Sequence, residues 1–97
     1  MDNNSISILI VDDDINYRTI LFDYLKSEGY DVVSVGSAEE AINKLEKDFF
    51  NIIISDLKLP GKSGIDLLNT VKSRSKDAEM IILTAFGSVD SAVAALK

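Results

Sequence analysis

Acidic and hydroxyl side chains follow directly after three apolar runs of this sequence, at residues 6–11, 51–55 and 79–83. These side chains belong to Asp12, Asp13, Asp14, Asp56 and Thr84. If the runs are neighbouring parallel strands, their carboxyl ends meet at one edge of a sheet, where clustered carboxylates repel one another by on the order of several kcal/mol. A bound cation removes this repulsion. Oxygen ligands without imidazole or thiolate favour Mg²⁺, with Mn²⁺ as the alternative.

The composition limits which side chains can react and which kinds of partner can bind. The 97 residues contain no histidine and no cysteine, which leaves carboxylates and hydroxyls as the reactive groups. The net charge of −6 disfavours direct contact with nucleic acid or with an anionic membrane surface. No apolar run approaches the roughly 20 residues of a membrane span, and the first residues are polar rather than signal-like. We therefore expect a cytoplasmic protein without a membrane anchor.

The apolar runs alternate with segments of helical periodicity. Four strands are predicted, at residues 6–11, 31–35, 51–55 and 79–83. The first helix is predicted to end at Gly29 and to bury a stripe made of Tyr17, Ile20, Leu21, Tyr24 and Leu25. Ser37 and Glu40 form the pattern of a capping box that begins the second helix. A third helix follows a loop at residues 57–64, and Ser88 is expected to cap a fourth.

This alternation predicts one domain over residues 1–97, with an α/β fold. Right-handed crossovers produce a doubly wound parallel sheet with helices on both faces, of the flavodoxin-like type. The partly polar strand at residues 31–35 suits an edge, which gives the strand order 2-1-3-4. Ligands of such sheets bind at the carboxyl ends of the strands, beside the switch point between strands 1 and 3.

Each candidate residue also has an ordinary structural interpretation. Aspartates before a helix commonly cap it and complement its dipole, and we assign this role to Asp14. Taken alone, Asp56 is typical of a turn, and Thr84 is typical of a strand end whose hydroxyl bonds to the backbone. The occurrence of such residues after three different strands, at one edge of one fold, favours a functional site.

Three motifs occur in a fixed order along the chain. They are the segment 8–14, Asp56 with Pro60 and Gly64 four and eight residues beyond it, and the segment 83–85. Each motif alone is weak, but the ordered set at this spacing is specific. It resembles the receiver domain of two-component response regulators, and the resemblance extends from about residue 6 to residue 97. The fold that it implies is CheY-like.

The resemblance implies a role for each matching residue. Asp56 is expected to accept a phosphoryl group, and Thr84 to hydrogen-bond the phosphoryl oxygens. Asp13 and Asp56 are expected to bind Mg²⁺ directly and Asp12 largely through water. The backbone carbonyl of Lys58 completes the protein ligands.

The resemblance also implies a function and partners. The domain is expected to be a phosphoryl-accepting switch that promotes its own phosphorylation and dephosphorylation, rather than an enzyme acting on a separate substrate. The donor would be a sensor histidine kinase or a phosphotransfer protein. Residues 84–97 further resemble receivers joined to ATPase transcriptional activators. We therefore expect an output domain absent from this chain, for which DNA binding is one option.

Receivers continue beyond their fourth helix into a fifth strand, which ends in a lysine, and a fifth helix. This sequence stops before both elements, so we expect a receiver domain truncated at its C-terminal end, with the fifth strand missing from the sheet. Lys97 is not the family lysine and is given no role. The strand at residues 79–83 would then be an apolar edge. The 97-residue chain is therefore expected to self-associate, through that edge or a rearranged fourth helix, or to be markedly less stable than the full receiver.

Two other functions compete with this interpretation. A metal-dependent phosphohydrolase could use Asp12 and Asp14, and many turnovers in a phosphatase assay would favour it. A non-catalytic flavodoxin-like binding module would show no change of mass with a phosphodonor.

Overall fold

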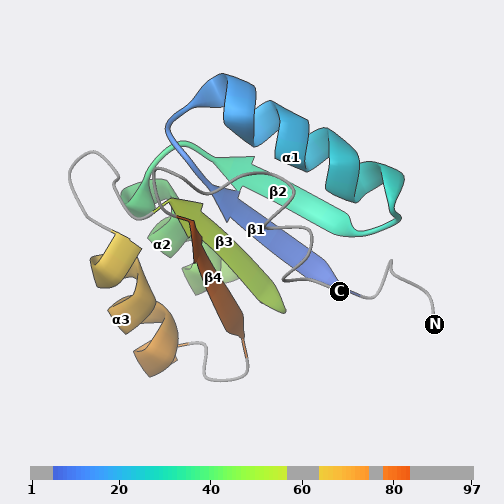
Figure 1. Cartoon of the computed structure of the whole chain (residues 1–97). Coiled ribbons are helices and arrows are strands. Elements are labelled where there is room, and N and C mark those ends of the chain that lie inside the picture. Colours follow the sequence, from blue (N-terminus) through green and yellow to red (C-terminus); the bar gives the residue numbers. More distant parts are fainter. Residues whose placement is uncertain (1–5, 57–63, 75–77, 84–97) are drawn as a thin grey trace.

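Four parallel strands form one sheet in the order β2-β1-β3-β4 in the computed structural model, which describes residues 6–56, 64–74 and 78–83 (Figure 1). The strands are β1 (Ser7–Val11), β2 (Asp31–Val35), β3 (Ile52–Asp56) and β4 (Glu79–Leu83). The helices are α1 (Ile15–Ser27), α2 (Ala38–Lys47) and α3 (Gly64–Arg74). The predicted α/β class and strand order are confirmed. The predicted loop at residues 57–64 ends one residue earlier, because Gly64 is the first residue of α3. Its residues 57–63 and the fourth helix expected from Ser88 lie outside the described residues.

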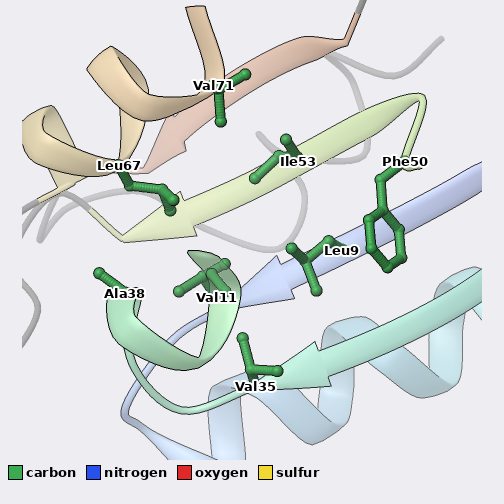
Figure 2. Close-up of a cluster of buried hydrophobic side chains, with 9 residues drawn as sticks. Leu9, Val11, Val35, Ala38, Phe50, Ile53, Leu67 and Val71 are labelled. Carbon is green, nitrogen blue, oxygen red and sulfur yellow. The ribbon is translucent and has the colours of Figure 1, made fainter. Parts of the chain in front are cut away.

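The helices cover both faces of the sheet, with α1 on one face and α2 and α3 on the other (Figure 1). This arrangement explains why β1 is apolar at almost every position: Ile8, Leu9, Ile10 and Val11 are all buried, alternately facing the two helical layers. Leu9 and Val11 pack toward α2 and α3, together with Ile53 of β3 (Figure 2). The sheet is therefore a rigid central layer whose carboxyl edge can hold loops in fixed positions.

Helix α1 begins and ends at residues with defined capping roles. The Oδ1 atom of Asp14 accepts hydrogen bonds from the backbone N–H groups of Asn16 and Tyr17, at 3.0 and 3.2 Å. At the other end Gly29 has a φ of 95°, and the N–H of Tyr30 donates to the Leu25 carbonyl at 3.2 Å. This is a Schellman motif, which needs a left-handed residue and so favours glycine. The helix itself ends at Ser27, and the predicted role of Gly29 as its left-handed closing residue is confirmed.

One residue of the predicted α1 stripe is not part of the core. Leu21 and Leu25 are 1% exposed, whereas Ile20 is 56% exposed. Successive helical residues are about 100° apart around the axis, so the face centred on Leu21 and Leu25 leaves Ile20 on the flank of the helix. Spacing alone could not distinguish the centre of the stripe from its border.

Strand β3 lies one residue further along than the predicted range of 51–55. Asn51 precedes it and links it to β1: its backbone N–H donates to the Ser7 carbonyl, and its Oδ1 accepts from the Ser7 N–H, both at 2.9 Å. Asp56 is the last residue of β3 because it pairs with Leu83 of β4. None of the helices in the described ranges has the length and hydropathy of a membrane-spanning helix.

Candidate functional site

The carboxyl ends of β1 and β3 lie side by side. Val11 is opposite Ser55 in the parallel pair, so Asp12 and Asp56 are the next residues along their respective chains. Neighbouring strands are separated by about 4.8 Å, so the backbones of Asp12 and Asp56 leave the centre of the sheet as neighbours. The sequence predicted this proximity from the switch point of the fold, and the register confirms it for the backbone.

Hydrogen bonds of its backbone and of its side chain hold Asp12 in place. Its backbone N–H donates to the Val35 carbonyl at 3.2 Å, which ties the end of β1 to the end of β2. Its Oδ1 accepts a hydrogen bond of 2.9 Å from the Asp14 N–H. Its carbonyl accepts a hydrogen bond of 3.3 Å from Nη1 of Arg18. Because only 7% of Asp12 is exposed, its carboxylate has a fixed place at the edge of the sheet.

Asp13 and Asp14 differ in what their side chains do. Both are exposed. Asp14 caps α1, as the sequence predicted, and its Oδ1 is occupied by two backbone donors. Asp13 lies between the buried Asp12 and the cap, at the exposed surface of the turn. Of the two exposed carboxylates, Asp13 is therefore the better placed to receive a cation from solvent.

Arg18 was not singled out from the sequence, although it contacts the site. It lies one turn into α1, and its N–H donates to the Asp14 carbonyl at 3.0 Å. The signal that could have revealed it is its spacing: a residue four positions after a helix cap lies over the first turn and can reach back toward the preceding strand.

Only part of the predicted metal site falls within the described residues. Lys58 and Thr84 lie outside them, as does the side chain of Asp56, whose backbone alone is described. Within the described ranges no group of three metal-binding side chains is found. Asp12 and Asp13 supply two carboxylates at one edge, and the backbone of Asp56 emerges beside them. This all-oxygen donor set fits a hard divalent ion such as Mg²⁺.

Comparison with known proteins identifies the family. Residues 8–97 match the model of the response regulator receiver domain. The transcriptional regulatory protein ZraR of Escherichia coli is 35% identical over 97 residues, which are 100% of this chain and 22% of ZraR. The response regulator protein FleR of Pseudomonas aeruginosa is 38% identical over 90 residues, or 93% of this chain and 19% of FleR. The chain belongs to the response regulator receiver domain family.

A solved structure supports the same assignment for the receiver. The response regulator TrrA of Thermotoga maritima, in complex with Mg²⁺ and BeF, superposes with a TM-score of 0.78 at 36% identity, covering 84% of this chain and 70% of TrrA. Another structure contains TrrA in complex with the histidine kinase ThkA. The receiver is thus a CheY-like signalling switch, and it spans about a fifth of the length of ZraR and FleR.

Proposed function

We propose that Asp56 of this receiver accepts a phosphoryl group in a Mg²⁺-dependent reaction. The observation that carries the proposal is the register of β1 and β3. It brings the end of the strand that contains Asp56 next to the buried Asp12 and the exposed Asp13. An aspartate at the switch point of a doubly wound sheet, on a strand beside one that is followed by two further aspartates, supplies both the nucleophile and the cation ligands that phosphoryl transfer needs.

The proposed metal ligands are Asp12, largely through water, Asp13, Asp56 and the backbone carbonyl of Lys58. TrrA was solved with Mg²⁺, which supports this ion for the family. Mn²⁺ remains the alternative on ligand chemistry alone. A bound Mg²⁺ would neutralise charge on the phosphoryl oxygens, which a carboxylate nucleophile requires because both groups are anionic.

The proposed step is an in-line displacement at phosphorus. A carboxylate oxygen of Asp56 forms the new O–P bond while the P–N bond of a phosphohistidine breaks, and the electron pair of that bond stays on the imidazole nitrogen. The 97 residues contain no histidine, so the phosphohistidine of this step would lie outside them. Thr84 is proposed to donate a hydrogen bond from its hydroxyl to a phosphoryl oxygen, so that phosphorylation and the position of this residue are coupled.

The proposed donor is a sensor histidine kinase or a phosphotransfer protein. The complex of TrrA with ThkA supports a kinase partner for this family. The name of ZraR, a transcriptional regulatory protein, supports an output in transcription, through a domain outside this chain. Several expectations stay predictions. Two concern the output, which is expected to bind DNA or to be coupled to an ATPase activator. The others are that the receiver promotes its own phosphorylation and dephosphorylation, that it is cytoplasmic, and that the 97-residue chain self-associates.

The experiment that tests the function is intact-mass analysis of the full-length protein after treatment with acetyl phosphate and Mg²⁺. The expected product carries one phosphoryl group per chain, and hydroxylamine removes it, as it does from acyl phosphates. A parallel sample with EDTA should remain unmodified. No change of mass would indicate a non-catalytic binding module, and release of many phosphates per chain would indicate a phosphohydrolase.

A further inference from the structure

Arg18 and Gly36 lie in close contact at the edge of the sheet that holds Asp12. We infer that Arg18 is a positioning residue for the metal site, and that the absence of a side chain at Gly36 provides the space for its guanidinium. The inference rests on the proposed Mg²⁺ site and adds two residues, from α1 and from the end of β2, that nothing in the site chemistry alone would select.

Arg18 reaches the site through a hydrogen bond to the backbone of Asp12. Its Nη1 donates to the Asp12 carbonyl at 3.3 Å, while the Asp12 N–H donates to Val35 at 3.2 Å. The peptide groups on both sides of Asp12 are therefore anchored, one to β2 and one to α1. The backbone N–H of Asp14, two residues further along, donates a hydrogen bond of 2.9 Å to the Asp12 carboxylate. The turn that carries Asp13 thus has a fixed beginning and a fixed end.

Gly36 leaves space for the guanidinium of Arg18 because it has no side chain. A Cβ atom built at this position would lie 2.8 Å from Nη1 of Arg18 and 3.9 Å from its Cζ. The backbone of Gly36 does not have a positive φ, so an alanine there is not strained by conformation. The obstacle is the end of a flexible side chain, which can move aside. Gly36→Ala is therefore expected to leave the fold intact and to displace the guanidinium from Asp12.

A purely electrostatic role for Arg18 makes the opposite prediction. A guanidinium beside a cluster of carboxylates repels an incoming divalent cation, so removing its charge would strengthen Mg²⁺ binding. If Arg18 instead holds the Asp12 turn in the binding geometry, removing it weakens Mg²⁺ binding, because ligands that are no longer oriented lose affinity. The sign of the change distinguishes the two roles.

The test is a Mg²⁺ titration of the full-length protein, followed by calorimetry or by backbone amide chemical shifts. Arg18→Met and Gly36→Ala should each weaken Mg²⁺ binding by about tenfold, the lower end of the range for residues that support metal ligands. The double variant should be no weaker than Arg18→Met, since both changes remove the same contact. Lys26→Met is the matched control, because it removes one positive charge from the exposed last turn of α1.

A readout without metal accompanies the titration. Hydrogen exchange at the Asp14 amide should be faster in Arg18→Met and Gly36→Ala, with an unchanged unfolding temperature in Gly36→Ala. Tighter or unchanged Mg²⁺ binding in Arg18→Met, or unchanged binding in Gly36→Ala, would overturn the positioning role while leaving the metal site in place. Absence of Mg²⁺ binding by the unsubstituted protein would overturn the proposed site itself, and the role of Arg18 with it.

Discussion

Val11 of β1 lies directly opposite Ser55 of β3. Both are fully buried, with 0% exposure, so this pair fixes the register of the two central strands from inside the core. Because helices cover both faces of the sheet, a slip of one residue would instead draw an aspartate from the carboxyl edge toward the apolar interior, where an unpaired charge is costly. The hydrophobic core therefore determines that Asp12 and Asp56 emerge together at the carboxyl edge.

The two exposed aspartates of the first loop should contribute differently to metal binding. Asp13→Asn is expected to weaken Mg²⁺ binding about tenfold or more, because it removes the charge of a proposed ligand, whereas Asp14→Asn should have little effect since Asp14 caps α1. Parallel Mg²⁺ titrations of the two variants measure the difference. Equal losses of affinity would contradict this division of roles.

Loss of the helix cap at Asp14 should lower the stability of the protein rather than weaken its metal binding. Asp14→Ala removes the acceptor of two backbone hydrogen bonds and is expected to lower the free energy of unfolding by about 1 kcal/mol. Asp14→Asn keeps an acceptor of the same size and should lose much less. Urea unfolding of both variants checks the prediction, which fails if alanine and asparagine are equally tolerated.

Two isoleucines of equal size should contribute differently to stability because they differ in burial. Ile53 is 0% exposed in the centre of the sheet, and Ile53→Ala is expected to cost about 2 to 5 kcal/mol of stability. Ile20 is 56% exposed, and Ile20→Ala should change stability by no more than about 0.5 kcal/mol. Chemical denaturation compares them, and a similar loss in both variants would mean that the flank of α1 is covered in solution.

Two glycines should respond differently to alanine. Gly29 has a φ of 95°, so Gly29→Ala is expected to destabilise the protein by roughly 1 to 2 kcal/mol through the left-handed backbone. A Cβ atom at Gly36 would meet the movable ends of Arg18 and Glu40, so Gly36→Ala should be nearly neutral for stability. Thermal unfolding of the two variants tests this contrast, and the reverse order of stability would contradict it.

The sequence was sufficient for the strand order and for the cap at Asp14, because both follow from local patterns: buried β-branched runs and a polar residue before a helix. It was not sufficient for Ile20, whose spacing suits the core but whose angle on α1 does not. Arg18 was missed for a different reason. Its contacts with Asp12 and Gly36 join α1 to the ends of two strands. Its spacing after the cap at Asp14 indicates only that it can reach the preceding strand, not which backbone groups it meets there.

The most direct test of the central claim is the intact mass of the full-length Asp56→Asn variant after treatment with acetyl phosphate and Mg²⁺. The control is Asp31→Asn, which changes an exposed aspartate at the beginning of β2, at the opposite edge of the sheet. We predict one hydroxylamine-sensitive phosphoryl group on the unsubstituted protein and on Asp31→Asn, and none on Asp56→Asn. Equal phosphorylation of the Asp56→Asn variant would contradict the assignment of Asp56 as the acceptor.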